Sequence, residues 1–132
     1  GIGLKIAETL LSEGANVIIT GRSKNLIKNQ FNKLYSKFRL KVAYTNGDIK
    51  SNLVLKKIKN LVKKRWKKLD GIIANAGSVK MNISSFSSEK DFYWYQKNNF
   101  LTAFKFVNYF LKVLATVSLK SLVVSGFKFD FY

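Results

Sequence analysis

The sequence contains no cysteine and no histidine. The missing cysteines exclude disulfide bonds and thiolate chemistry, the missing histidines exclude imidazole acid–base catalysis, and both absences argue against the usual zinc sites. We therefore expect no metal site. Long apolar runs are missing too, because no stretch reaches about 18 apolar residues. The chain opens on a glycine turn rather than a basic and then apolar segment, so we expect neither a membrane span nor a secretory signal, and a cytoplasmic location.

Acidic residues are scarce: 24 lysines and arginines stand against 7 aspartates and glutamates, for a formal net charge of +17. Eight of the basic residues fall within positions 56–68, where Ile58, Leu61, Val62 and Trp66 recur at helical spacing. The basic residues therefore occupy the other face of one helix. We interpret that face as solvated; a patch for nucleic acid, anionic lipid or an acidic carrier protein is the alternative. A nucleic-acid binder would show a steep salt dependence of its affinity.

Glycines cluster at the start of the chain, where Gly1 and Gly3 precede an amphipathic helical pattern. Gly14 is suited to end that helix, and the β-branched run at 17–19 is suited to a buried strand. A glycine turn, a helix and a strand in this order form the second half of a unit in which a pyrophosphate approaches the N–H groups of a helix start. The first strand of that unit is absent from the sequence.

Helical and strand patterns alternate along the rest of the chain. The sequence predicts strands at about 16–20, 40–44, 71–74 and 121–125, helices at about 23–37, 51–68 and 89–116, and a polar loop at 78–91. The second helix is expected to turn Leu26, Ile27, Phe31 and Leu34 inward. This alternation indicates an α/β fold in one domain over residues 1–132: an incomplete Rossmann-like, doubly wound parallel sheet with right-handed crossovers.

Binding sites in such a sheet lie beyond the carboxyl ends of the strands. Arg22 stands two residues after the strand predicted to end at Thr20, where the adenosine ribose of a dinucleotide would lie. A guanidinium there suits a 2′-phosphate, whereas an acidic residue would bind the ribose 2′-hydroxyl, and positions 20–24 hold no acid. The predicted cofactor is therefore NADP, with NAD less favoured. A solvated arginine at a helix start is the alternative.

Other strand ends carry further candidates. Asp48 is placed to accept a hydrogen bond from an adenine amino group or to cap the following helix. Ala76 and Gly77 allow a ligand to approach the backbone, although a tight turn alone explains them. Asn75 is suited to fix that turn or to hold a ribose. Asn99 lies within an aromatic-rich helix, where a buried amide needs a partner, either structural or an ordered water.

Together these residues resemble a short-chain dehydrogenase/reductase. The resemblance rests on GIG at 1–3, ITGR at 19–22, GDI at 47–49, ANAG at 74–77 and NNFLTAF at 98–104. It implies hydride transfer between a nicotinamide and a small carbonyl or alcohol substrate, and it implies homo-oligomers. The cofactor-binding residues it implies are Gly1, Ile2, Gly3, Arg22, Ser23, Asp48, Ile49, Asn75, Ala76 and Gly77. The catalytic residues it implies are Asn99 and Ser125.

The family also uses a tyrosine and a lysine four residues later as its acid–base pair, and no Tyr-x-x-x-Lys occurs from Ser125 onward. We therefore expect residues 1–132 to be a piece of a longer reading frame, or a truncated or frameshifted product, without catalysis. A noncatalytic nucleotide-binding or scaffold protein is the alternative. In the 3-2-1-4-5 strand order the missing strand would stand between those at 16–20 and 71–74. An empty position there would leave buried backbone groups unpaired, so we expect poor folding.

Overall fold

The computed structural model describes residues 1–79, 88–114 and 121–125. Its α-helices and strands, in chain order, are α1 Ile2–Ser12, β1 Asn16–Gly21, α2 Lys24–Phe38, β2 Val42–Asn46, α3 Asn52–Arg65, β3 Gly71–Ile73, α4 Glu89–Tyr95, α5 Leu101–Leu114 and β4 Ser121–Ser125. A 3-10 turn, η1 Arg39–Lys41, precedes β2, and a π-helical segment, η3 Gln96–Phe100, joins α4 to α5. The alternation of helices and strands follows the sequence-based expectation.

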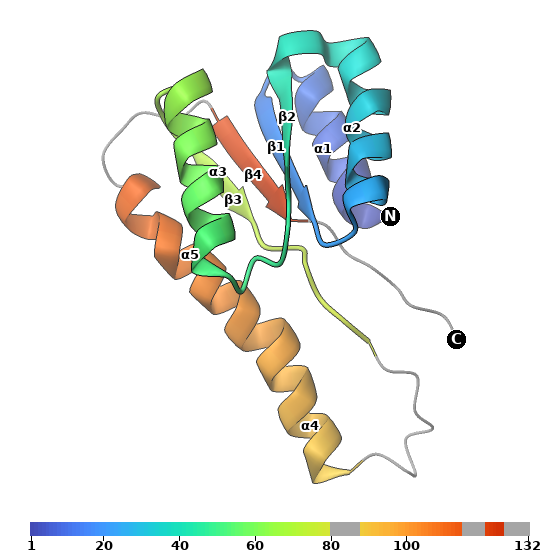
Figure 1. The fold of residues 1–132 in the computed structure, drawn as a ribbon, viewed down its shortest axis with the longest axis vertical. Helices are drawn as coiled ribbons and strands as arrows, with labels where there is room; N and C mark the ends of the chain where they lie inside the picture. The colour runs from blue at the N-terminus through green and yellow to red at the C-terminus, as the bar shows by residue number, and fades with distance from the viewer. Residues whose placement is uncertain (80–87, 115–120, 126–132) are drawn as a thin grey trace.

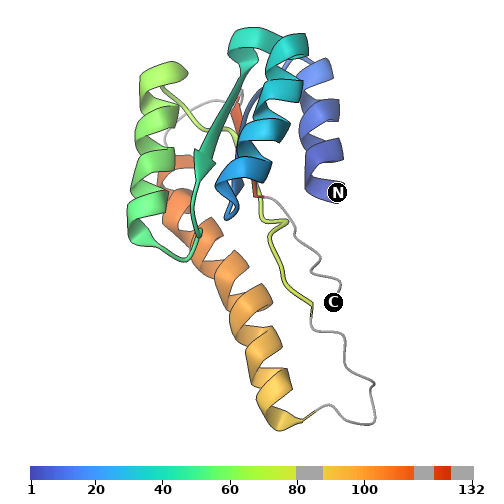
Figure 2. The same cartoon turned by 45° about the vertical axis from the view of Figure 1, so that its right-hand side comes forward.

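The helices form two layers around the sheet (Figure 1), with α1 and α2 on one face and α3 and α5 on the other. Alternate side chains of β1 separate the two cores, because Val17 and Ile19 pack with α1 and α2 while Ile18 packs with α3 and α5. The same separation is visible after rotation in Figure 2. Both faces of β1 are therefore buried, which explains its continuous apolar sequence.

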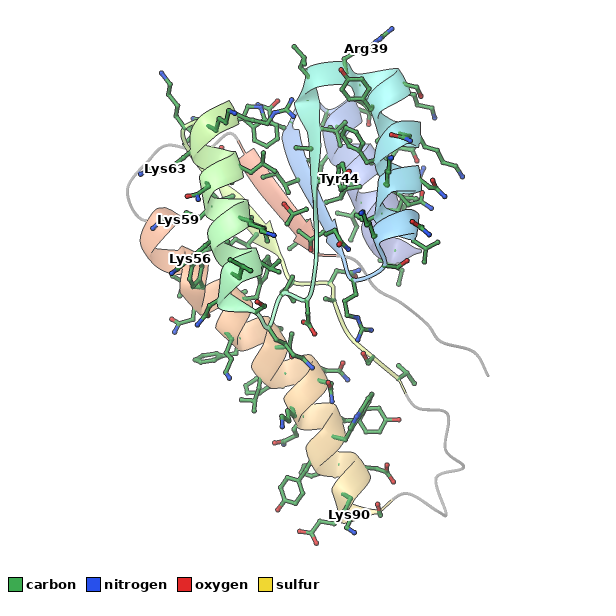
Figure 3. All side chains as sticks on the ribbon, viewed as in Figure 1. Arg39, Tyr44, Lys56, Lys59, Lys63 and Lys90 are labelled. Carbon is green, nitrogen blue, oxygen red and sulfur yellow. The ribbon has the colours of Figure 1, made fainter. Side chains whose placement is uncertain are left out.

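Helix α3 confirms the expected division between apolar and basic faces. Its buried residues are Val54, Leu55, Ile58 and Val62. Lys56, Lys59 and Lys63 are exposed along its outer side, and Figure 3 shows them pointing away from the sheet.

On the opposite face of the sheet, Lys37 of α2 joins that helix to α1. Its Nζ donates to Glu8 Oε1 at 3.2 Å, and this contact lowers the pKa of Glu8. The contact between Lys37 and Glu8 therefore stabilises the fold above the unfolded pKa of the Glu8 carboxyl group. This stabilisation is lost as the pH falls through the lower pKa of the folded state.

Three details of the predicted elements were wrong. Leu26 was expected to face the core, but it is 52% exposed because the first turn of α2 faces the cavity described below. Leu40 was expected to begin the second strand, but it lies in the 3-10 turn and is 71% exposed. Helix α3 ends at Arg65 rather than near Lys68. Parts of the predicted loop (80–87) and of the last helix (115–116) lie outside the described residues.

The sheet has the strand order β2-β1-β4-β3 and all its pairs are parallel. The expected empty position between β1 and β3, which we call the central position, is instead occupied by β4. Residues Asn16–Thr20 pair with Ser121–Ser125 on one side, and Gly71–Ile73 pair with Leu122–Val124 on the other. The predicted row of unpaired backbone groups was therefore wrong, and the reason for expecting poor folding disappears with it.

The crossover from β3 through α5 to β4 is opposite in handedness to the other two crossovers, which run through α2 and through α3. Helices α3 and α5 cover the same face. The chain moves across the sheet toward β3 through α3, but it moves back toward β1 through α5. Because the first of these crossovers is right-handed, the second is left-handed, whereas about 98% of such connections are right-handed. The expectation of right-handed crossovers was thus wrong for this last unit, because β4 lies inside β3 rather than beyond it.

Candidate functional site: a cavity at the carboxyl ends of the strands

A cavity of about 230 Å³ is lined by residues at the ends of β1 and β2 and in the first turn of α1. Figure 1 shows how these elements are arranged around the sheet. Its walls come from the start of α1, the loop after β1, the loop after β2, the segment after β3 and the η3–α5 helix. Among the predicted site residues, its lining includes Gly1, Gly3, Arg22, Ser23, Asp48, Ile49, Ala76 and Gly77. Segments far apart in the sequence thus meet at one edge, as parallel strands require.

The start of α1 contributes main-chain groups to this cavity. Gly1 is the N-cap residue of α1 and provides no side-chain cap, and Gly3 is buried. The first N–H groups of a helix have no partner within the helix and favour an anion. Ile2, which the resemblance also implies, is 62% exposed and is not among the lining residues. The glycines thus leave the helix start open to a ligand.

The loop that carries Arg22 is held by a residue that sequence reasoning missed. Asn46, the last residue of β2, donates through Nδ2 to Gly21 O at 3.2 Å and to Arg22 O at 2.8 Å. Ser23 caps α2, because its Oγ accepts from Leu26 N–H at 3.4 Å. The main chain around Arg22 is therefore fixed while the guanidinium is exposed toward solvent. The only signal in the sequence was an asparagine two residues after the predicted strand at 40–44.

Asp48 is partly engaged by its own turn. Its Oδ1 accepts from Lys50 N–H at 2.9 Å, and its main-chain oxygen accepts from Ser51 N–H at 2.9 Å. Ser51 is the N-cap of α3 but makes no side-chain cap bond. The ammonium of Lys50 donates to Asn98 Oδ1 and so links the loop after β2 to η3. Lys50 and Asn98, both in the lining, were not predicted as site residues.

Asn99 joins the segment after β3 to η3 through two hydrogen bonds. Ser78 N–H donates to Asn99 Oδ1 at 2.7 Å, and Asn99 Nδ2 donates to Ser78 O at 3.0 Å. The amide of Asn99 is therefore hydrogen-bonded to the backbone of Ser78. Neither Asn99 nor the half-buried Asn75 is among the lining residues. Asn99 instead positions the segment whose Ala76 and Gly77 do line the cavity.

Replacing Asn99 by alanine removes both of these bonds at once. We expect Asn99→Ala to lower the free energy of unfolding by about 1–3 kcal/mol, because Ser78 loses its partners in a half-buried position. Chemical denaturation monitored by circular dichroism measures this loss. The exposed neighbour Lys97→Ala in the same segment serves as the control, and an equal effect of both substitutions would contradict the positioning role.

Ser125, the predicted catalytic serine, ends β4 and pairs with Thr20 of β1. The structure describes the backbone of Ser125, which the central position brings to the carboxyl edge of the sheet. Thr20 lines the cavity and is 1% exposed. Within the described part of the chain, its Oγ1 has no hydrogen-bond partner, and neither does the buried Oε1 of Gln30 in the same lining. Two buried polar atoms of this kind fit a polar ligand, since an unsatisfied buried group is costly.

Metal-binding clusters and membrane-spanning helices are absent from the described residues. No group of three or more acidic side chains among them is arranged to hold a metal ion. No helix in the described ranges is both long and apolar enough to cross a membrane. The cavity is the feature on which the function can be argued.

Comparison with known families matches residues 1–123 to the short chain dehydrogenase family. The chain belongs to this family. One curated relative of the chain is "Dehydrogenase/reductase SDR family member 4" of Caenorhabditis elegans, which is 36% identical over 77 residues, covering 58% of this chain and 30% of the relative. The resemblance in the sequence motifs is thereby confirmed.

Solved structures show the same fold. L-Sorbose reductase from Gluconobacter frateurii, complexed with NADPH and L-sorbose, is 20% identical with a TM-score of 0.72, over 86% of this chain and 43% of the reductase. An alcohol dehydrogenase from Thermococcus sibiricus, complexed with 5-hydroxy-NADP, is 24% identical with a TM-score of 0.75, over 93% of this chain and 52% of that enzyme. The chain therefore spans about a third of the curated relative and about half of these structures. It shares the Rossmann-like α/β fold that the sequence predicted.

Proposed function

We propose that this chain is the cofactor-binding part of an NADP-dependent short-chain oxidoreductase. When bound, the cofactor supplies the hydride that the complete protein exchanges with a carbonyl or alcohol substrate. The observation that carries the proposal is the single cavity in which the glycine start of α1, Arg22 and Asp48 meet. The two structural relatives above, solved with NADPH or a modified NADP, support a nicotinamide dinucleotide as the ligand.

Each wall of the cavity has a separate role in this proposal. The N–H groups at the start of α1 hold the pyrophosphate, because the helix start favours negative charge. Arg22 and Ser23 hold the 2′-phosphate, since a guanidinium forms bidentate, charge-assisted bonds to phosphate. Asp48 accepts from the adenine amino group through carboxylate capacity that its own turn does not use, and Ile49 lies beside it, 7% exposed. Ala76 and Gly77 leave space for the ligand beside the segment that Asn99 positions.

Catalysis is proposed to depend on residues outside 1–132. No Tyr-x-x-x-Lys occurs from Ser125 onward, so the acid–base pair of the family has no counterpart there. We propose a cytoplasmic location for the complete oxidoreductase. The complete protein is proposed to form homo-oligomers through the exposed aromatic side of η3 and α5, where Phe100 and Phe104 stack at 6.3 Å with 67% and 58% of their surfaces exposed.

Titration of the purified chain with NADPH and NADH, followed by calorimetry, tests the proposal. We expect NADPH to bind at least tenfold more tightly than NADH, a difference of about 1.4 kcal/mol. No NADPH oxidation is expected with carbonyl substrates. Failure of both nucleotides to bind would contradict the proposed function. Measurable turnover by the chain would contradict the proposal that the acid–base pair lies outside residues 1–132. NADPH binding without turnover by the longer protein would favour the noncatalytic alternative.

A further inference from the structure

The outer side of α3 carries charge of one sign. Every exposed residue from position 56 to position 64 is a lysine or Asn60, and the residue at 67, just after the helix, is an exposed lysine too. We call these cations the lysine face, whose members are Lys56, Lys57, Lys59, Lys63, Lys64 and Lys67. A helix face that only meets solvent is typically laced with charges of both signs, so this face is a different kind of surface.

The lysine face has no acidic partner within the described residues. Positions 49–69 contain no aspartate and no glutamate. The ion pairs found in the described parts of the chain involve Lys5, Lys37 and Lys68, and none of them involves the lysine face. Its charge is therefore left for solvent ions or for a partner outside the chain.

The cations of this face also repel one another. Lys59 is three residues after Lys56 and four before Lys63, and like charges at these spacings destabilise a helix. Lys67 adds a further cation with a φ of +66°, a conformation that glycine usually provides at a helix end. A partner that is negatively charged along its length would remove this repulsion. The face is thus complementary to a polyanion.

The chemistry of the face distinguishes among polyanions. A protein partner needs apolar or aromatic anchors at the centre of an interface, but Leu53, the exposed apolar residue of α3, precedes the lysines. A membrane takes up the apolar side of a helix, but that side of α3 is buried against the sheet. A single-stranded nucleic acid stacks its bases on aromatic rings, and the exposed residues at 56–64 include none. The backbone of a duplex requires only cations.

The dimensions of the lysine face fit duplex DNA. At 1.5 Å per residue, Lys56 and Lys64 are about 12 Å apart along the helix, a length over which one DNA strand presents about three or four phosphates. At about 100° per residue, Lys57 and Lys59 lie on opposite flanks of the face. The major groove of B-DNA admits an α-helix, whereas that of duplex RNA is too narrow. Cations on both flanks are therefore suited to the two strands that border one major groove of DNA.

We propose that the lysine face of α3 binds the phosphate backbone of double-stranded DNA at the major groove, without reading its sequence. The ammonium groups donate to phosphate oxygens and displace the counterions of the duplex. None of the six lysines lines the nucleotide cavity, so this surface is separate from it. The chain can then hold a nucleotide and DNA at the same time.

Fluorescence anisotropy with a fluorescein-labelled DNA duplex of about 16 base pairs tests this proposal. The triple variant Lys56→Gln, Lys59→Gln, Lys63→Gln removes three of the six charges. We expect it to bind at least tenfold more weakly than the unaltered chain at about 100 mM NaCl. The slope of log affinity against log salt concentration is expected to become shallower by about 2–3, since each phosphate contact contributes about 0.9. A duplex of different sequence is expected to bind equally.

A matched control separates the position of the cations from the net charge. The triple variant Lys24→Gln, Lys28→Gln, Lys33→Gln removes the same charge from exposed positions of α2, on the opposite face of the sheet. We expect it to change the affinity for the duplex by less than about threefold, since it alters only the long-range charge.

A second variant of the lysine face separates charge from folding. The triple variant Lys56→Arg, Lys59→Arg, Lys63→Arg keeps the three charges, and we expect it to retain both the affinity and the salt slope of the unaltered chain. Circular dichroism of each variant reports on its fold.

Several results would overturn the proposal: no binding of the duplex to the unaltered chain, equal losses in the α3 and α2 glutamine variants, or an equal loss in the arginine variant. Equal affinity for polyglutamate, for phosphatidylserine vesicles or for an RNA duplex of the same sequence would contradict DNA as the partner. Displacement of the duplex by 2′,5′-ADP would place the DNA in the cavity and would also overturn it. Nucleotide titration of the same samples without DNA reports on the proposed function separately.

Discussion

Gly47→Ala is expected to lower the free energy of unfolding by roughly 2–5 kcal/mol, from backbone strain and overpacking together. Gly47 has a φ of +141°, a conformation that residues with a side chain rarely adopt. A Cβ at this position would lie 2.4 Å from Cγ2 of Val54, which is buried in the first turn of α3. Because Gly47 N–H also donates to Gly21 O at 3.0 Å, the turn cannot move away without losing the contact between the loops after β1 and β2.

The control for this prediction separates backbone strain from collision. Gly14 also has a positive φ, +91°, but the nearest atom to its added Cβ is the flexible Lys41 Nζ at 3.8 Å. We expect Gly14→Ala to cost less than Gly47→Ala, and Val54→Ala to recover part of the loss when combined with Gly47→Ala. Urea denaturation of the single and double variants measures both effects. Equal losses for the two glycine substitutions would show that the collision with Val54 contributes nothing.

Arg22→Asp is expected to reverse the nucleotide preference of the cavity. The substitution removes a charge-assisted bond to the 2′-phosphate and adds a carboxylate suited to the ribose 2′-hydroxyl. At about 1.5–3 kcal/mol for a hydrogen bond to a charged group, the loss corresponds to roughly 10- to 150-fold weaker binding of NADPH. Repulsion between the new carboxylate and the phosphate increases the loss. Calorimetric titration with 2′,5′-ADP and with 5′-AMP isolates this part of the cofactor.

The control for Arg22 is its near neighbour Lys24, an exposed cation that is not among the lining residues. We expect Lys24→Ala to weaken 2′,5′-ADP and 5′-AMP by similar, small factors, since it changes only the long-range charge. A loss of 2′,5′-ADP affinity in Lys24→Ala as large as in Arg22→Asp would show that net charge, rather than the position of the guanidinium, determines the preference. Unchanged discrimination in Arg22→Asp would contradict the predicted role.

The helices and strands of this fold could be predicted from the sequence because each is specified by neighbouring residues. The β-branched run of β1, the serine before α2 and the apolar spacing of α3 each specify one element from its own residues. The convergence of Arg22 and Asp48 on one cavity also followed from sequence, since parallel strands end at one edge. The notable failure, β4 in the central position, concerns pairing between residues about a hundred positions apart, for which periodicity carries no information.

The contacts that hold the cavity walls were missed for a related reason. Asn46 bonds to main-chain oxygens of a loop 24 and 25 residues earlier, and Lys50 bonds to a side chain 48 residues later. Neither residue type is distinctive at a strand end or in a turn. Asn99 was singled out only because an amide in an aromatic helix needs a partner, and the identity of that partner, Ser78, depended on the path of the chain after β3.

The π-helical turn at Gln96–Phe100 allows one continuous helical segment to contact two separate loops. A turn closed by i to i+5 bonds is wider than an α-turn, so consecutive residues are separated by a smaller angle. The adjacent amides of Asn98 and Asn99 can then point toward the same side of the helix. Asn98 meets the loop after β2 through Lys50, and Asn99 meets the segment after β3 through Ser78. Through these two adjacent amides the loop after β2 and the segment after β3 share one anchor on the same helix.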